Sequence, residues 1–414
     1  MGSTTPPSAT PAPSADQFPP ANSPSLILTR PTNAERRQTW SLTHPMWGPA
    51  LSHDDYLQRE AYLTTVPLAK DGGVTHWILT EASQPPDGRP ILSSCETLRK
   101  RVLCVRPGAN GGVVEEGLAH AIGSVFTDPK FRGRGYASRM MREVGSSLRG
   151  WQVKGKGEGD AEEEGGVLFS VLYSDIGKTF YAKTGWVPFE SSHAAFPPVP
   201  GAVSGLEPQD GYRGALARPI GYHELAELCN VDERLLRAAL VKRVEEYQKQ
   251  GKTTTCVALL PDLDVLLWHM MREDFVTKHI FGRTPAVKGA VYGEPGRRVW
   301  AVWTRGYYGG LEQIKGNTLH VLRVVVEDEE QLDEYLTEGF RAIVQIAQAE
   351  ATEWRSQDVQ MWNPTPRLRS IIEKSGLEYE HVDRDNDSIA SLMWYGEGDA
   401  SGLDWVANEK YGWC

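Results

Sequence analysis

The pattern of apolar and polar residues predicts a chain that mixes strands and helices over both of its halves. In the first half, short apolar runs indicate strands, and polar residues that can cap a helix precede helical stretches. We expect strands near 26–28, 74–79, 90–94, 101–105, 118–127, 167–173 and 186–189, with 90–94 and 101–105 as parts of a hairpin or a longer ribbon. We expect helices from Thr32 or Asn33, from Ser52, over 136–148 and over 176–183.

The second half repeats this order of elements: hairpin, strand, helix, strand, helix and strand. Its predicted helices are 222–247, 263–278, 331–353 and 366–375, and its predicted strands are 253–260, 286–292, 298–308, 319–326, 359–362 and 389–395. Such a pattern is typical of an α/β (α+β) fold. A chain of 414 residues is long enough for two or three domains.

Three segments lack this periodicity and divide the chain. Residues 1–24 consist mainly of Pro, Ser, Thr and Ala, which predicts a disordered tail. Residues 201–220 carry several Pro and Gly and indicate a linker, so we expect domains at 25–200 and 221–414. The Gly-, Lys- and Glu-rich stretch 152–166 is typical of an exposed insertion.

The charge and the cysteines narrow the class of protein. A net charge of -10 argues against a nucleic-acid binder and favours a cationic or neutral small substrate. No stretch approaches the ~20 apolar residues that span a bilayer, and no secretory signal begins the chain, so no membrane partner is expected. The odd number of cysteines, without metal-ligand spacing, predicts reduced thiols, no metal site and a cytoplasmic protein. These are Cys95, Cys104, Cys229, Cys256 and Cys414.

The strongest chemical signal lies directly after the predicted strand 118–127. There the sequence reads Arg132-Gly133-Arg134-Gly135-Tyr136-Ala137 and leads into a predicted helix. Glycines at a strand-to-helix turn let main-chain N–H groups approach a ligand, and the helix N-terminus adds partial positive charge. Together with two arginines, this turn predicts a pyrophosphate cradle. It has neither the spacing of a dinucleotide-binding loop nor the Gly-Lys-Ser/Thr of a Walker loop.

Residues 118–190 resemble the core of the GCN5-related N-acetyltransferase (GNAT) superfamily. Arg132, Gly135 and Ala137 match its acyl-CoA motif. The later match is Phe180, Tyr181, Gly185 and Trp186, which follow an apolar strand. The resemblance implies the GNAT fold and acetyl-CoA as co-substrate. It implies that the pantetheine arm is contacted by Val125 and Thr127, that the pyrophosphate is bound by the main chain from Gly133 to Ala137, and that Ser174 stands where many members have Asn.

The resemblance also implies catalytic roles. Tyr181 matches the family's general acid, and a phenol of pKa ~10 can protonate a departing thiolate of pKa ~8.5. Alternatively, Tyr181 is a packed core tyrosine. His120 lies near where the family often places a base, although it could equally be a core histidine. Other candidates for the base are Glu115, Glu116 and, by similarity to N-myristoyltransferases, the Cys414 carboxylate.

The second half lacks the cradle. Its loop after strand 319–326 reads Glu327-Asp328-Glu329-Glu330, and four acids repel a pyrophosphate. We therefore predict a degenerate GNAT-like domain that binds no CoA and instead forms a wall of the substrate cleft.

The whole chain resembles fungal lysine N6-acetyltransferases of lysine catabolism. The matching late segments are 391–396 and 408–414. This implies free L-lysine as acceptor; a protein lysine, a polyamine, a secondary-metabolite amine or a non-catalytic acetyl-CoA sensor are the alternatives. A free amino acid needs a cation for its carboxylate and an acid for its α-amine. Candidates by position are Arg305, Arg323, Asp358, Asp383, Asp385 and Asp387.

Overall fold

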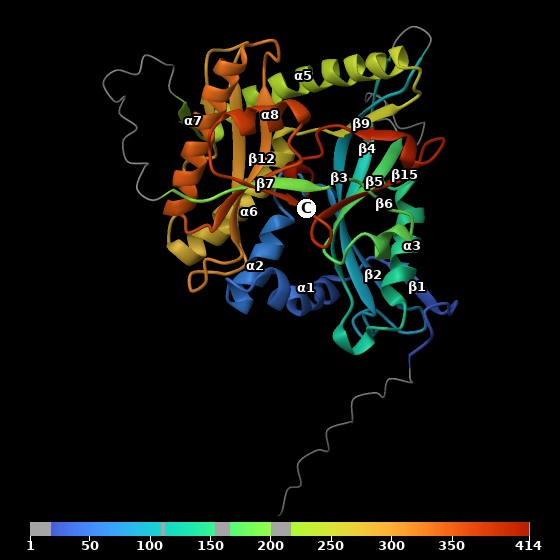
Figure 1. Cartoon of the computed structure of the whole chain (residues 1–414). Coiled ribbons are helices and arrows are strands. Elements are labelled where there is room, and N and C mark those ends of the chain that lie inside the picture. The colour runs from blue at the N-terminus through green and yellow to red at the C-terminus, as the bar shows by residue number, and fades with distance from the viewer. Residues whose placement is uncertain (1–17, 109–111, 154–165, 200–216, 414) are drawn as a thin grey trace, which may run out of the picture.

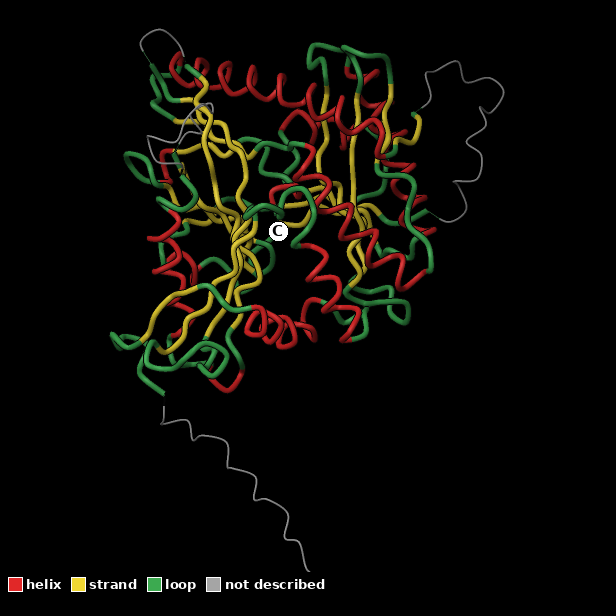
Figure 2. Tube along the Cα trace, turned by 180° about the vertical axis from the view of Figure 1, so that it is seen from behind, coloured by secondary structure: helices red, strands yellow, loops and turns green. Residues whose placement is uncertain are grey.

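A computed structural model describes residues 18–108, 112–153, 166–199 and 217–413 (Figure 1). Two mixed β-sheets stand side by side, with helices between them and on their outer faces. The C-terminal segment runs to the middle of the molecule, between the two sheets, in both views (Figures 1 and 2). This arrangement confirms the α/β (α+β) class.

The first sheet has nine strands and contains the predicted cofactor-binding strands. Its main path runs in the order β1-β2-β3-β4-β5-β15-β6, and β9 pairs with both β3 and β16. The strands are β1 (Leu26–Thr29), β2 (Val74–Glu81), β3 (Ser93–Val105), β4 (Val114–Phe126), β5 (Val167–Ser174), β6 (Val187–Pro188), β9 (Thr255–Leu259), β15 (Ile389–Trp394) and β16 (Leu403–Trp405). The long strand β3 contains the end of the segment 90–94 and all of 101–105, and it pairs with β2 and β4, so both segments belong to one long ribbon.

The second sheet has seven strands in the order β14-β7-β13-β12-β11-β10-β8. They are β7 (Ser192–Phe196), β8 (Arg218–Ile220), β10 (Gly289–Tyr292), β11 (Val299–Tyr307), β12 (Asn317–Val326), β13 (Asp358–Trp362) and β14 (Glu380–Asp383). Strand β8 lies inside the range 201–220 that the sequence indicated as linker. Residues 201–216 of that range lie outside the described part of the chain.

Eight α-helices complete the described residues. They are α1 (Asn33–Trp47), α2 (His53–Leu63), α3 (Tyr136–Leu148), α4 (Thr179–Ala182), α5 (Tyr222–Lys249), α6 (Leu263–Phe281), α7 (Asp333–Glu353) and α8 (Pro366–Lys374). The helix starts follow from local chemistry. Thr32 and Glu35 form a capping box at α1, and the Ser52 hydroxyl accepts the Asp55 N–H at α2, as the sequence predicts.

The two sheets exchange strands. Strand β15, from the end of the chain, pairs antiparallel with β5, and β7, from the first half, pairs antiparallel with β13. Each sheet is therefore completed by a strand from the other half of the sequence. Strands β9 and β16 also join the first sheet although both follow residue 221. The two halves consequently fold around each other's strands rather than as separate sequence blocks.

One apolar core joins the two sheets. It contains Ala119 and Phe169 of the first sheet, Trp300 and Leu322 of the second, and Trp268 of α6 between them. Helix α3 packs on the other side of the first sheet, and α7 and α8 pack on the second. None of the helices in the described ranges is apolar enough over a sufficient length to cross a membrane.

Residues 18–24, which we expected to belong to the disordered tail, pack against the first sheet. The ring of Phe18 lies 4.9 Å from that of Phe131, centre to centre. The Tyr136 hydroxyl donates to the Pro19 carbonyl at 2.7 Å, and Arg139 donates to the Ala21 carbonyl at 3.0 Å. The sequence missed this segment because one aromatic among prolines gives no periodic signal. Residues 1–17 and most of the insertion 152–166 lie outside the described residues.

Candidate active site

Strands β4 and β5 separate at the point where the glycine loop begins. Their parallel pairing ends at Ile122 and Leu172. Just beyond, β4 carries a bulge, because Glu96 of β3 pairs with Gly123 whereas Ser94 pairs with Phe126. Ser124 in this bulge has a φ of 53°, in the left-handed region. A cavity of about 200 Å³ lies at this opening, lined by both strands.

The glycine loop has the backbone that a pyrophosphate site requires. Gly133 and Gly135 have φ values of 77° and 81°, which side chains rarely adopt. A Cβ on Gly133 would meet no atom within 4 Å, so the loop faces open space there. Gly135 is the N-cap of α3 and has no side chain to cap it, which leaves the first-turn N–H groups available. These residues fit the diphosphate of CoA, and Tyr136 and Ala137 supply the first helical N–H groups.

The two loop arginines occupy different surroundings. Arg132 is exposed, donates from Nε to the Thr127 carbonyl at 3.1 Å and lies 5.6 Å from the ring centre of Phe126. It therefore braces the loop while its charge stays near the loop surface. Arg134 is half-buried next to the glycines. The Tyr136 side chain is buried and bonds the N-terminal segment, so only its main chain faces the loop.

The three residues expected to contact the pantetheine arm differ in their surroundings. Val125 lines the cavity, three residues beyond Ile122 on β4. Thr127 is half-buried, and its hydroxyl lies 2.9 Å from that of Ser93. Ser174 is buried, and its hydroxyl is used in its own turn, since it donates to the Gly177 carbonyl at 2.7 Å and accepts the Ile176 N–H. The structure thus brings Val125 to the cavity and gives Ser174 a local role.

Tyr181 also lines the cavity. It lies on the short helix α4, and only 8% of the residue is exposed. Burial, with the nearby Cys95 and Asp175 adding to it, raises the pKa of the Tyr181 phenol. The phenol therefore stays protonated at neutral pH and can serve as a proton donor.

The expected bases lie elsewhere. His120 is fully buried, and its Nε2 lies 3.2 Å from the Trp151 carbonyl. Burial lowers the pKa of His120 to about 4, and the residue is not part of the cavity lining. Glu115 pairs with Arg106, and Glu116 pairs with Arg101 and Arg237, away from the cavity. Cys414 lies outside the described residues.

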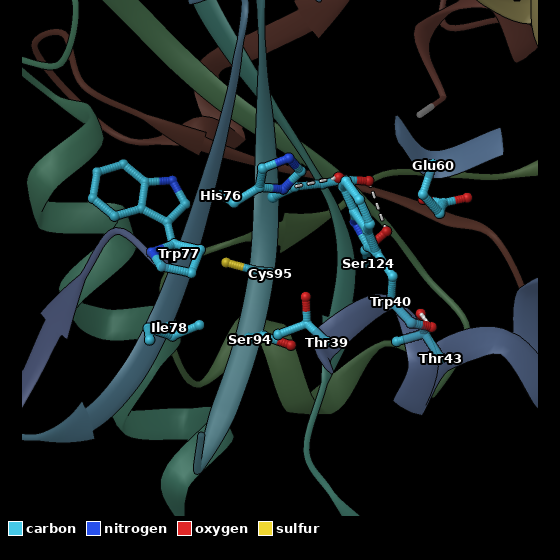
Figure 3. Close-up of a pocket in the computed structure, with 12 residues that line it drawn as sticks. Thr39, Trp40, Thr43, Glu60, His76, Trp77, Ile78, Ser94, Cys95 and Ser124 are labelled. Atoms are coloured by element: carbon cyan, nitrogen blue, oxygen red, sulfur yellow. Dashed lines mark hydrogen bonds and ion pairs between the residues drawn. The ribbon is translucent and has the colours of Figure 1, made fainter. Parts of the chain in front are cut away.

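Two acids that the sequence did not single out stand in the cavity wall: Glu96 of β3 and Glu60 of α2. Both also line two smaller cavities of about 20 Å³ each, of which Figure 3 shows the one bordered by Trp40 and Ser124. Ser124 donates to Glu96 Oε1 at 2.7 Å, and His76 Nδ1 lies 3.4 Å from Glu96 Oε2. Glu60 pairs with Arg59 at 2.5 Å. The side chains of Glu96 and Glu60 are 17% and 11% exposed, respectively.

Burial is the main cause of the pKa shifts of Glu96, Glu60 and His76. It raises the pKa of Glu96, with only partial offset from the Ser124 hydrogen bond and two arginines. Burial likewise raises the pKa of Glu60, against the attraction of Arg59. The pKa of His76 falls to about 4, mainly through burial, so its imidazole is neutral at pH 7. A buried carboxylate with a raised pKa beside a cavity is well suited to accept a proton.

A cation faces the same cavity from α6. Arg272 lines it together with Trp268, Tyr308 and Trp413. The Arg272 guanidinium lies 5.9 Å from the ring centre of Trp413. Within the described ranges no carboxylate lies within ion-pair distance of Arg272, which leaves its fork available for an anion.

The cations and acids that the sequence suggested for substrate binding lie outside this cavity. Arg305 is buried between Glu273 and Glu350, and Arg323 between Asp232 and Glu409. The aspartates line no part of it either; they are Asp358, Asp383, Asp385 and Asp387. Glu96 could have been noticed as the lone charged residue in 91–98, but the sequence does not reveal that β3 turns it toward the cavity.

These features define a GNAT-type N-acetyltransferase: parallel strands that separate at a bulge, a glycine loop at a helix start, and a tyrosine over the opening. The chain belongs to the family described as LYC1 GNAT-like C-terminal domain, whose model matches residues 198–414. It is an acetyl-transferring enzyme of the GNAT superfamily, whose members use acetyl-CoA as co-substrate. The second half is accordingly a GNAT-like domain, as its order of elements predicts.

The chain is similar to two fungal proteins and to a solved bacterial structure. The chain is 26% identical over 420 residues to a lysine acetyltransferase of Yarrowia lipolytica, covering 92% of this chain and 97% of the relative. It is 27% identical to an uncharacterized protein of Saccharomyces cerevisiae, covering 58% of this chain and 62% of the relative. Among solved structures, a GCN5-related N-acetyltransferase from Anabaena variabilis shares 12% identity at a TM-score of 0.45, covering 89% of this chain and 72% of that one.

Proposed function

We propose that this enzyme transfers the acetyl group of acetyl-CoA to the ε-amine of free L-lysine. The observation that carries the proposal is a single cavity of about 200 Å³ that opens at the separated strands. It holds a phenol, two mostly buried carboxylates and a guanidinium that has no acid partner among the described residues. The similarity to the Yarrowia lipolytica lysine acetyltransferase over nearly the whole chain supports lysine as the amine.

The cofactor side of the site is the glycine loop and the end of β4. Main-chain N–H groups from Gly133 to Ala137 bind the diphosphate, helped by the partial charge of the α3 N-terminus and by Arg132 and Arg134. Val125 contacts the pantetheine arm at the opening between β4 and β5. The thioester then lies at the cavity, next to Tyr181.

The reaction needs one proton acceptor and one proton donor. Glu96 takes the proton from the ε-ammonium, the freed amine attacks the thioester carbonyl carbon, and the C–S bond breaks. Tyr181, whose raised pKa keeps the phenol protonated, gives its proton to the departing thiolate, and the second proton of the attacking nitrogen then restores the phenol as the amide forms. Ser124 and His76 hold the Glu96 carboxylate in place.

The acceptor is held at its other end by Arg272. A guanidinium without an acid partner binds a carboxylate through two parallel hydrogen bonds, which fixes both position and orientation. Glu60 lines the same cavity, and because Arg59 bonds it at Oε1, its Oε2 can accept from the α-ammonium. Binding both α-groups leaves only the ε-amine to reach the thioester. A lysine within a peptide lacks these α-groups, which favours the free amino acid.

We further propose that this acetylation serves lysine breakdown in the cytoplasm. The acidic composition suits a soluble metabolic enzyme, and the four cysteines in the described ranges are free and buried. The resemblance of segments 391–396 and 408–414 to fungal lysine N6-acetyltransferases of lysine catabolism supports the pathway.

Thiol release tests the proposal. Purified protein is mixed with acetyl-CoA and, in separate reactions, L-lysine, a lysine-containing peptide, a polyamine or no amine. Release with L-lysine well above the other amines is expected. Preference for the peptide or the polyamine contradicts free lysine as the acceptor. Binding of acetyl-CoA without turnover on any amine indicates a sensor and contradicts an enzymatic role.

A further inference from the structure

The second sheet contains a cleft built like the cofactor cleft of the first. The parallel pairing of β12 with β13 ends at Val321 and Met361, as that of β4 with β5 ends at Ile122 and Leu172. Strand β12 also carries a bulge, because Val302 pairs with Arg323 and Trp303 with Val321. Val125 in β4 and Val324 in β12 each lie three residues beyond the last parallel pair of their own strand. The two valines are therefore equivalent positions.

The segment before the C-terminus occupies this second cleft. Glu409 Oε2 accepts the main-chain N–H of Val324 at 3.0 Å. The same carboxylate pairs with Arg323, which also holds Asp232 at 2.7 Å. Asn363, directly after β13, donates to the Asn408 carbonyl at 2.5 Å. A carboxylate of the chain itself thus bonds the strand edge that corresponds to the pantetheine-facing edge of β4.

The opposite end of the cleft offers no place for a diphosphate. Helix α7 begins with Asp333 and Glu334 in its first turn, whereas no acid stands in the first turn of α3. Glu327 bonds Arg298 and the Gly296 N–H, and Glu329 lines the remaining space of about 430 Å³. Acids at a helix N-terminus occupy the position that an anion would otherwise take.

From the second cleft the segment runs directly to the acceptor cavity. The Tyr411 side chain is fully buried and donates to the Leu259 carbonyl at 2.8 Å. His269 Nε2 lies 3.1 Å from the Tyr411 carbonyl, and Lys100 donates to the Gly412 carbonyl at 2.8 Å. The next residue is Trp413, in the cavity wall beside Arg272.

We propose that Asn408 and Glu409 fill the degenerate cleft in the way the pantetheine arm fills the functional one, and that Glu409 is thereby a positioning residue for Trp413 and Arg272. Trp413 directly follows the short 3-10 helix Lys410–Gly412, so it keeps one position only if the residues before it are fixed. The Asp232–Arg323–Glu409 network supplies that anchor. The effect on the reaction rests on the function proposed above; the anchoring does not.

Two variants of Glu409 test this, with Glu397→Ala as control because Glu397 is exposed and lies outside the cleft. Glu409→Ala removes the acceptor of the Val324 N–H, and Glu409→Gln keeps an acceptor oxygen but loses the charge. We expect Glu409→Ala to raise KM for L-lysine about tenfold, since a small displacement of a positioning group costs this much or more. The Kd for acetyl-CoA should stay at the wild-type value, and Glu409→Gln should lie between.

Amide hydrogen exchange over residues 408–413 provides a readout that needs no acceptor. Faster exchange at Trp413 in Glu409→Ala supports the anchoring whichever amine proves to be the substrate, and unchanged exchange overturns it. A lower Tm with wild-type KM and kcat per folded molecule would show that Glu409 only stabilises the fold, and would overturn its positioning role. Absence of lysine turnover in the wild-type protein would contradict the proposed function alone.

Discussion

The Ser124 hydroxyl donates a 2.7 Å hydrogen bond to the Glu96 carboxylate across the bulge that opens the first sheet. Ser124 adopts left-handed backbone geometry to do so, which is uncommon for a residue other than glycine. Strained backbone of this kind concentrates at functional sites because the surrounding structure must hold it there. The bulge therefore both separates β4 from β5 and aims a polar group at the proposed base.

Replacing Glu96 by Gln should remove the proton acceptor while keeping its shape. We expect kcat to fall about 10²–10⁴-fold, the range that general acid–base groups contribute. Burial raises the pKa of Glu96, so the wild-type rate should rise with pH above the ordinary carboxyl range of ~4.3, and this limb should vanish in Glu96→Gln. Steady-state rates from pH 4 to 9 measure it. Glu81→Gln, half-buried at the end of β2 and outside the cavity lining, is the control, and a wild-type profile for Glu96→Gln would exclude the role.

The same substitution should stabilise the protein. Because the pKa of Glu96 is higher in the folded state than in the unfolded state, the folded state binds more protons between the two values, and stability falls as pH rises through that window. A Gln side chain does not ionise, so its burial costs no additional stability as the pH rises. We expect Glu96→Gln to raise Tm at pH 7 and to lose this gain below pH 4. Thermal unfolding at both pH values tests the sign.

Arg272→Ala should affect acceptors according to their α-carboxylate. We expect kcat/KM for L-lysine to fall about 10²-fold, the loss of a charge-assisted hydrogen-bonded pair worth ~2–3 kcal/mol. Cadaverine, which is lysine without the carboxylate, should react poorly with the wild-type enzyme and equally poorly with the variant. Parallel losses for both amines would contradict the assignment. Arg283→Ala, a surface change close to the end of α6, should leave both rates unchanged.

Tyr181→Phe should separate chemistry from cofactor binding. The phenol's proton is needed only when the thiolate departs, so kcat should fall about 10²-fold or more while the Kd for acetyl-CoA stays unchanged. Stopped assays of thiol release, beside calorimetry, give both values. Tyr335→Phe, in the second half, serves as control. A wild-type kcat for Tyr181→Phe would reduce Tyr181 to a packing residue.

The sequence predicted the parts of the site that depend on local order. The loop from Arg132 to Ala137 and the tyrosine at 181 are recognisable because a strand, a turn and a helix follow each other directly. Glu96 was missed because its role depends on β3 lying next to the bulge in β4. Arg272 was missed because α6 meets that cavity only through tertiary packing. His120 looked well placed along β4, but it contacts the segment after α3.

The exchange of strands between the sheets was equally hidden from the sequence. The apolar run 389–395 is visible as a strand, but nothing local shows that β15 pairs with β5 rather than with its nearer neighbours. Register and partner are decided by the whole sheet. The order of elements in the second half did predict the GNAT-like domain, because that order follows the chain.

The number of acetyl-CoA molecules bound per chain tests the central claim most directly. Calorimetric titration of the intact protein should give one site per chain. Gly135→Val, which places a branched side chain at a φ of 81°, should weaken that binding about tenfold or more, while Gly150→Ala at the exposed end of α3 leaves it unchanged. Two sites per chain, no heat of binding, or full affinity in Gly135→Val would contradict the account.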